Sequence, residues 1–459
     1  MKRSVMPFLL GWLHSTSRKP LVVRGARQVG KTWLVRHVAK VNNLQLIELN
    51  FEKNPEYKQY FINNDPHVVL RYLEAAFQCT FDPQKSLLFL DEIQAAPELI
   101  SKLRWFFEDL PQLPVIAAGS LLEFTLANYP FSMPVGRIEY LHLEPLSFEE
   151  FLLALEKDKL YDFLNSLYFT ELQHLPQPMH EQLMMLFKDY LLVGGLPAAV
   201  ASWIEHKSLE KIGYIHHNLM ATYRDDFHKY SGKLNISRLE DVLIAIPNLL
   251  GKKFIYSHVN KDVQSAPLKQ ALDLLTKAKL CSKVSACAAN GIPIGSEPKK
   301  NHFKMILLDI GLANNLLGLR LNQLMNSQDI LLINNGAIAE QVTGQLLRTI
   351  TPACMEPLLY YWFREENKSS AEVDYIIQHQ TNIVPIEVKA GSSGHLKSLH
   401  LFMALKKLPI AIRINSELPS IVDINLGTLI NETANYKLLS LPFYLVGQIN
   451  RLLDQHNQK

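Results

Sequence analysis

The chain has 459 residues, of which 48% are hydrophobic and 20% are charged, so at about 150 residues per domain it has room for roughly three domains with sizeable cores. Its 20 glycines and 24 prolines are too few for a collagen or a low-complexity chain. The formal net charge of +3 is too small to indicate a nucleic-acid partner by itself.

Cysteine usage and hydropathy limit the cellular setting. The four cysteines are scattered and offer no zinc-ligand spacing, which favours a reducing cytoplasm without structural metal or disulfides. No apolar run reaches about 18 residues, so no membrane span is expected. The apolar residues 5–13 are interrupted by Pro7 and followed by Arg18 and Lys19, which favours an amphipathic helix over a signal peptide.

The first third of the chain alternates strand-like and helix-like segments. Residues 87–90 form a continuous apolar run, which is typical of a strand buried on both faces. The alternation predicts an α/β domain over residues 1–144, with a parallel sheet and helices on both faces. In chain order the expected elements are strand 21–23, helix 33–40, strand 46–51, helix 65–77, strand 87–90, helix 97–109 and strand 115–118.

A phosphate-binding motif follows the first of these strands. Residues 25–32 fit G-x-x-x-x-G-K-[ST], with the strand before and the helix after that the motif requires. Its glycines let backbone N–H groups turn toward phosphate oxygens, Lys31 reaches the β- and γ-phosphates, and Thr32 can bind Mg²⁺. The alternative is an ordinary glycine-containing turn. The predicted ATP-binding residues are Gly25, Ala26, Arg27, Gln28, Val29, Gly30, Lys31, Thr32, Trp33 and Ser120.

An acidic pair ends the buried strand at residues 87–90. We expect Asp91 to hold the Mg²⁺ and Glu92 to polarise the attacking water. An apolar run that ends in Asp-Glu is by itself common where a strand meets solvent. Its position 60 residues after Lys31, with one strand and two helical patterns between, favours the catalytic interpretation.

Two further polar residues are candidates for the same site. Ser120, at the end of the strand 115–118, can sense the γ-phosphate, although a Gly-Ser turn explains it as well. Arg137 can reach the nucleotide of a neighbouring subunit and stabilise transition-state charge in trans, although an exposed arginine is more often simply solvated.

The middle of the chain is helical and then basic. Residues 145–230 predict an all-helical lid, and residues 231–304 predict three short helices with a two-stranded wing, as in a winged helix. Residues 251–304 carry ten lysines and three acids, so the positive charge is local. A helix over residues 267–279 would turn Lys269 and Lys277 outward, where they could contact DNA phosphates, although lysine faces are usually only solvated.

These motifs together resemble a prokaryotic family of AAA-type P-loop ATPases. Besides the phosphate motif and Asp91-Glu92, the resemblance includes Gly136-Arg137, the Glu-Pro-Leu-Ser-Phe-Glu-Glu-Phe run at residues 144–151 and the Gly-Gly-Leu-Pro run at residues 194–197. The resemblance implies a sheet with the P-loop strand central, a helical lid, a winged helix and a C-terminal domain similar to PD-(D/E)-x-K nucleases, with a restriction-endonuclease-like α/β fold, over residues 305–459.

The C-terminal part carries a matching set of polar residues. Glu387 and Lys389 lie two apart on an expected strand at 383–389, so they share one face. Asp374 lies on the strand before and Glu340 on the helix 337–349. Glu340, Asp374 and Glu387 would gather around Mg²⁺ while Lys389 orients or deprotonates the attacking water. The plain alternative is a surface charge pair between Glu387 and Lys389.

The sequence motifs are compatible with three functions. The first is a cytoplasmic, ATP-hydrolysing and DNA-associated enzyme, monomeric or homo-oligomeric, whose nucleotide state controls a terminal nuclease. The second is an ATP-driven switch or scaffold whose end domain binds a protein partner and cuts nothing. A small-molecule kinase is disfavoured because Asp91-Glu92 suits water activation better than substrate phosphorylation.

Overall fold

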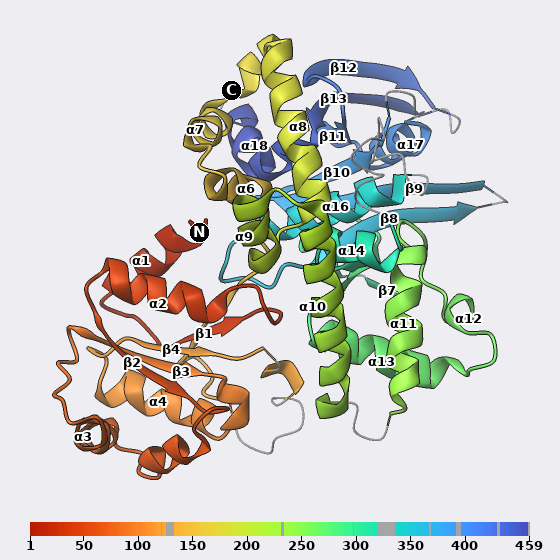
Figure 1. The fold of residues 1–459 in the computed structure, drawn as a ribbon. Coiled ribbons are helices and arrows are strands. Elements are labelled where there is room, and N and C mark those ends of the chain that lie inside the picture. Colours follow the sequence, from red (N-terminus) through yellow and green to blue (C-terminus); the bar gives the residue numbers. More distant parts are fainter. Residues whose placement is uncertain are drawn as a thin grey trace. The chain divides into compact units, whose positions relative to one another are not determined.

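The structure is a computed structural model, which describes residues 1–120, 122–124, 133–230, 234–296, 298–319, 336–366, 369–391, 396–428 and 432–457. The chain forms two compact units (Figure 1). The first comprises residues 1–144, 277–279 and 351–356, and the second comprises residues 145–276, 280–350 and 357–459. The finer division into four domains stays a prediction.

The first unit is built on a five-stranded, fully parallel sheet in the order β2-β3-β4-β1-β5. The buried runs of β3 and β4 were predicted, whereas β5, with only four residues of mixed polarity, was not. Its strands are β1 (Leu21–Arg24), β2 (Gln45–Asn50), β3 (Ser86–Asp91), β4 (Val115–Ala118) and β5 (Glu139–His142), and its helices are α1 (Met6–His14), α2 (Lys31–Val41), α3 (Pro66–Phe77) and α4 (Leu99–Asp109).

The strand register brings the expected motifs to one edge of this sheet. In the ladder, Asp91 lies opposite Ala118, which in turn lies opposite Val23 of β1. Because carboxyl ends of parallel strands meet at one edge, the phosphate motif after β1, the acids at the end of β3 and the Gly-Ser pair after β4 converge there.

The second unit contains the expected helical run and a mixed sheet. The helices predicted between residues 145 and 230 and over residues 337–349 are present. Its helices are α6 (Phe148–Ala154), α7 (Asp158–Ser166), α8 (Gln177–Val193), α9 (Pro197–His206), α10 (Leu209–Tyr230), α11 (Ile236–Asn248), α12 (Tyr256–Val259), α13 (Ser265–Lys277), α14 (Ile310–Leu316), α16 (Ala337–Thr349), α17 (Lys397–Lys406) and α18 (Ile449–Asn457).

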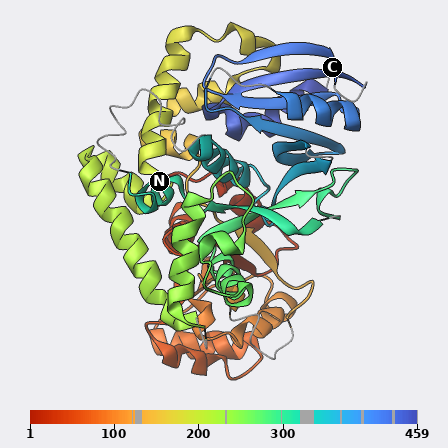
Figure 2. The same ribbon diagram turned by 90° about the vertical axis from the view of Figure 1, so that its right-hand side faces the viewer.

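The mixed sheet has eight strands in the order β12-β13-β11-β10-β9-β8-β6-β7. Figure 2 shows it from the blue C-terminal strands to the green β6–β7 hairpin. That hairpin was predicted to be a separate wing, but β6 pairs in parallel with β8. The expected domain boundary at residue 304 falls inside β7. The strands are β6 (Cys281–Cys287), β7 (Pro298–Leu307), β8 (Leu359–Glu366), β9 (Ser369–His379), β10 (Asn382–Val388), β11 (Ile410–Asn415), β12 (Ser420–Gly427) and β13 (Thr433–Pro442).

The motif at residues 194–197 has a structural role. The carboxylate of Asp309, at the start of α14, accepts a hydrogen bond of 2.6 Å from the backbone N–H of Gly195. A Cβ at Gly194 would lie 2.1 Å from Asp309 Oδ1, and Gly194 has φ +76°. Only glycine allows this close approach, so the motif fixes α8 and α9 against α14.

The motif at residues 144–151 also serves packing. Ser147 and Glu150 form a capping box at the start of α6, which satisfies N–H groups of the first turn. The buried carboxylate of Glu149 accepts a hydrogen bond of 3.1 Å from Gln448. This contact ties α6 to the C-terminal segment of the same unit.

Two observations bear on the cellular setting. All four cysteines are free. Among the helices that the structure describes, none combines the length and the apolarity that crossing a bilayer requires.

Candidate nucleotide site and carboxylate cluster

The phosphate motif forms a tight loop between β1 and α2. Gly30 takes φ +96° at the N-cap of α2, and Gln28 also has a positive φ of 65°. The left-handed backbone at Gly30 directs the first N–H groups of α2 toward the loop. The sequence prediction of a strand, a glycine loop and a helix start is therefore met at this site.

Lys31 is buried under this loop. Its ammonium group donates to the carbonyl oxygens of Gly25 at 3.0 Å and Ala26 at 2.7 Å. Burial lowers the pKa of Lys31 to about 8, although the nearby Glu92 and Asp91 oppose this shift. A buried cation whose hydrogen bonds go to neutral carbonyls gains charge compensation when an anion binds.

Thr32 and Asp91 are in contact, as a shared Mg²⁺ site requires. The hydroxyl of Thr32 donates to the Asp91 carboxylate at 3.2–3.3 Å, and Asn50 donates to Asp91 Oδ2 at 3.2 Å. Burial and the neighbouring Glu92 raise the pKa of Asp91 to about 6. Mg²⁺ is usually held by one or two protein oxygens together with water and substrate phosphates, so this pair fits the ion.

Glu92 is held in an unusual backbone conformation. Its φ of +51° and ψ of +46° are left-handed, which is strained for a non-glycine residue and is typical of functional sites. Gln94 Nε2 donates to Glu92 Oε2 at 2.6 Å. A Cβ at Gly119 would lie 2.4 Å from Gln94 Oε1, so Gly119 gives the Gln94 side chain the space from which it binds Glu92.

Three other predicted residues have partners within the first unit. Ser120 is buried and accepts a hydrogen bond of 3.1 Å from Arg27 Nε, so it is connected to the phosphate loop through Arg27. Arg137 is half-exposed and pairs with Glu108 at 2.9 Å. Trp33 stacks on His37 with ring centroids 4.6 Å apart. Neither Asn50 nor Gln94 was predicted from the sequence.

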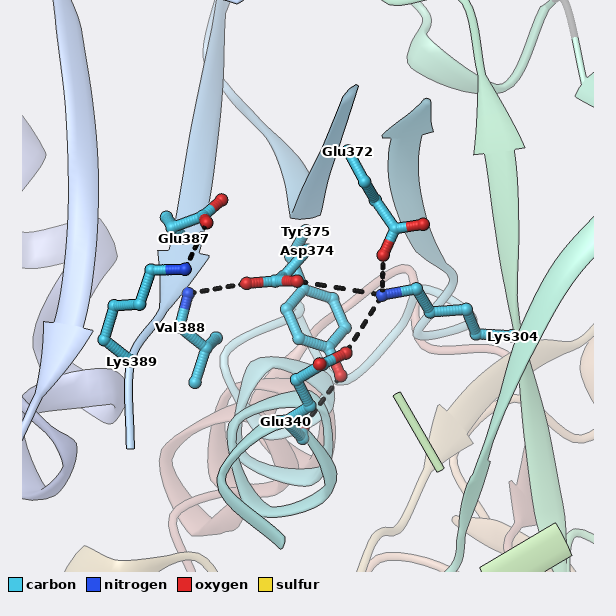
Figure 3. A network of polar contacts seen from close by, with 8 residues as sticks. All are labelled: Lys304, Glu340, Glu372, Asp374, Tyr375, Glu387, Val388 and Lys389. Atoms are coloured by element: carbon cyan, nitrogen blue, oxygen red, sulfur yellow. Dashed lines mark hydrogen bonds and ion pairs between the residues drawn. The ribbon is translucent and has the colours of Figure 1, made fainter. Parts of the chain in front are cut away.

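A second polar cluster lies in the second unit (Figure 3). The ammonium group of Lys304 on β7 lies 3.0 Å from Glu340 Oε2 and 3.7 Å from Asp374 Oδ1, and it also contacts Glu372. The side chain of Lys304 is only 4% exposed. Burial opposes its charge, but the three carboxylates outweigh burial and hold the pKa of Lys304 well above its usual value.

Glu387 and Lys389 form the other half of this cluster. Lys389 Nζ donates to Glu387 Oε1 at 2.7 Å, so the two side chains share a face, as predicted. Glu387 is 7% exposed, and its Oε2 is buried without a hydrogen-bond partner. Burial and the nearby Asp374 raise the pKa of Glu387, against the effect of Lys389. Asp374 Oδ2 accepts a hydrogen bond of 2.8 Å from the backbone N–H of Val388.

The expected nuclease metal does not fit this arrangement. Glu340 and Asp374 converge on the Lys304 ammonium, whereas Glu387 is paired with Lys389. In the described ranges, no group of three His, Cys, Asp or Glu residues is arranged to hold a metal ion. Neither Lys304 nor Glu372 was predicted as a site residue from the sequence. A lysine between the apolar Phe303 and Met305 was the available signal.

The lysine-rich segment has the predicted helical face. Leu268, Ala271, Leu272 and Leu275 of α13 are buried. Lys269 and Lys277 are exposed on the other side of the helix.

Comparisons with known proteins identify the first domain. Residues 17–152 match a family described as an AAA domain. Residues 184–323 match a domain of unknown function (DUF8612), and residues 335–424 match another (DUF4143). The first domain is therefore an AAA-type P-loop domain, and this match supports ATP binding and hydrolysis. No curated protein matches the chain.

Several solved structures are similar over long stretches. The Aeropyrum pernix ORC2 protein in ADPNP–ADP complexes is 14% identical, with 70% of this chain and 91% of that chain covered and a TM-score of 0.34. The Drosophila ORC bound to DNA is 15% identical, with 69% and 98% covered and a TM-score of 0.23. The Thermotoga maritima RuvB Holliday junction branch migration motor is 14% identical, with 60% and 85% covered and a TM-score of 0.25. These scores are too low to carry an argument about this chain.

Proposed function

We propose that this protein hydrolyses ATP with Mg²⁺ in the cytoplasm, at a site beside the carboxyl ends of the strands of the parallel sheet. The observation that carries the proposal is the buried ammonium group of Lys31, whose hydrogen bonds at 2.7 and 3.0 Å go only to carbonyl oxygens. The next residue, Thr32, is hydrogen-bonded to Asp91. A triphosphate would supply the negative charge that this buried cation lacks. The AAA domain match supports the same activity.

Each residue at the edge of the sheet has a distinct role in this proposal. The backbone N–H groups of residues 25–30 and the start of α2 bind the phosphates. Thr32 and Asp91 hold Mg²⁺, which neutralises phosphate charge when it is bound. Glu92 orients the attacking water and accepts its proton. For this, Glu92 must exchange its hydrogen bond with Gln94 for one with water.

Two further contacts connect this site to nucleotide state and to a second copy. Ser120 reports on the phosphate loop through its hydrogen bond from Arg27. Arg137 serves a neighbouring subunit in a homo-oligomer, and its release from Glu108 is the step that makes it available.

A binding experiment tests the role of Lys31. Lys31→Ala should abolish detectable binding of a fluorescent ATP analogue, whereas Lys40→Ala, an exposed lysine at the end of the same helix, should bind normally. Equal affinity of the two variants would refute the assignment of the phosphate site.

A turnover experiment tests the role of Glu92. Glu92→Gln should retain bound ATP and release little phosphate, since the general base is lost while the phosphate contacts remain. Glu98→Gln, an exposed acid at the start of α4, is the matched control. Phosphate release by Glu92→Gln at the rate of this control would contradict the proposed base.

DNA association is a second candidate, favoured by the exposed lysines on α13 opposite its buried face. In this proposal α11, α12 and α13 act as a helical DNA-binding module whose lysines contact phosphates. The affinity for duplex DNA should then fall steeply as salt rises, and Lys269→Ala with Lys277→Ala should reduce the salt dependence. Salt-independent binding would favour a protein partner instead.

A further inference from the structure

The acids that the sequence assigns to one metal site are divided between two lysines of the chain. Glu340 and Asp374 face Lys304, together with the unpredicted Glu372. Glu387 faces Lys389. Figure 3 shows Asp374 between these two groups, with one oxygen directed toward the backbone N–H of Val388 and the other toward Lys304.

We propose that Lys304 is the resident cation of this carboxylate cluster. Its ammonium group lies between Glu340 and Asp374, two of the three acids that were predicted to hold Mg²⁺. The end domain therefore binds no Mg²⁺ there and does not cut phosphodiester bonds by a metal-assisted mechanism. This inference concerns the second unit and does not depend on ATP hydrolysis at the phosphate loop.

The burial of Lys304 shows that its position is built into the fold. Lys304 lies on β7 between the buried Phe303 and Met305. Its ammonium group lies 5.3 Å from the ring centroid of Tyr361 on β8. A lysine that only needed solvent would turn outward, whereas this side chain passes over an aromatic ring to reach acids on α16 and β9.

The space around the acids is also occupied. A Cβ at Gly251 would lie 2.8 Å from Glu340 Oε1, so backbone closes on that side of the Glu340 carboxylate. Tyr375 donates its hydroxyl to the backbone oxygen of Glu340 at 2.8 Å, which fixes the turn of α16 that carries this acid.

An ammonium group and a divalent ion compete for the same oxygens. Mg²⁺ requires nearly octahedral oxygen ligands at short distances and gives up its water reluctantly. Glu340 Oε2 and Asp374 Oδ1 already face the ammonium group of Lys304. Asp374 Oδ2 accepts a hydrogen bond from the backbone N–H of Val388. Glu387 Oε2 is the buried carboxylate oxygen of this set without a partner, and one oxygen does not make a metal site.

Mn²⁺ binding to the nucleotide-free, full-length protein tests the proposal, with free Mn²⁺ counted by electron paramagnetic resonance. The wild-type protein and Asp374→Asn should bind the same number of ions at about millimolar Mn²⁺. A wild-type Mn²⁺ ion that disappears in Asp374→Asn or Glu340→Gln would overturn the proposal. This comparison needs no change at Lys304, so it decides the question even if variants of that residue fail to fold.

Removal of the ammonium group provides the positive test. Lys304→Met should gain one Mn²⁺ per chain, and Lys304→Met with Asp374→Asn should lose it again. The matched control is Lys283→Met, because Lys283 lies on the same hairpin and pairs with Asp273 outside the cluster. A folded Lys304→Met variant that gains no ion would also overturn the proposal. ATP is absent throughout, so a failed ATPase assignment would leave these results unchanged.

Discussion

Lys31 and Lys304, two lysines buried in the described part of the chain, differ in the partners that surround them. Lys31 donates to two neutral carbonyl oxygens, and burial lowers its pKa to about 8. Lys304 is equally buried, yet three carboxylates outweigh burial and hold its pKa well above the usual value. The first lysine donates to carbonyl oxygens and not to a carboxylate in the free protein, so it is suited to bind an anionic ligand. The second is itself the counterion of a closed cluster.

This difference separates a binding site from a structural charge cluster. Both sites place a buried lysine beside acids, and the acids of both sites were predicted to be catalytic. A buried charge costs free energy unless it is paired. The partner of the ammonium group therefore distinguishes a site that awaits a ligand from one that is already satisfied.

The largest expected effect comes from breaking the satisfied cluster. Lys304→Met should lower the free energy of unfolding by about 3–5 kcal/mol, because it leaves buried carboxylates without a counterion. Urea denaturation measures this change. Lys283→Met removes a partly exposed lysine with one acidic partner and should cost less than about 1 kcal/mol. A similar loss in the free energy of unfolding for both variants would mean that the ion pairs of Lys304 contribute no more than a surface ion pair.

Replacement of Lys31 should change the free energy of unfolding in the opposite direction. Its pKa in the folded state, about 8, lies below the ordinary value, so at pH 7 folding is opposed by the cost of keeping the ammonium charged. This cost is about 3 kcal/mol. Lys31→Met should therefore stabilise the nucleotide-free protein by a few kcal/mol at most while it abolishes ATP binding. Thermal denaturation at pH 7 without nucleotide measures the effect, and strong destabilisation would contradict the comparison.

The smallest effect is a pH dependence of ATP affinity. Above pH 8 the free protein loses the Lys31 proton, whereas the phosphate-bound form retains it, so binding takes up a proton and weakens by about tenfold between pH 7 and pH 9. Calorimetry in two buffers of different ionisation enthalpy should detect this uptake. An affinity that stays constant from pH 7 to pH 9 would show that Lys31 keeps its proton in the free protein.

The sequence predicts local structure better than long-range partners. The phosphate loop depends on eight consecutive residues between a strand and a helix, and Asp91 and Ala118 end strands whose apolar runs are unmistakable. By contrast, the four-residue strand β5 and the strands β11, β12 and β13 were not predicted. β5 is short and of mixed polarity, and β12 is largely exposed, so these strands depend on their neighbours in the sheet more than on their own residues.

Among the site residues, too, contacts between residues close in sequence were predicted better than contacts between distant ones. The contact between Glu387 and Lys389 follows from their spacing of two in a strand. Lys304 reaches Glu340 and Asp374 only because of the strand order of the mixed sheet and the helix packed beside it. No residue pattern within β7 indicates those partners, so the sequence alone identifies Lys304 only as part of a basic segment.

The parallel pairing of β6 with β8 has a consequence for how this chain can be divided by recombination. An exchange of gene segments at residue 304 would separate two halves of one hydrogen-bonded sheet and leave β8 with an open edge. Such edges recruit foreign strands and promote aggregation. The basic segment and the end domain therefore share one sheet and should be exchanged together, although their sequences look like independent modules.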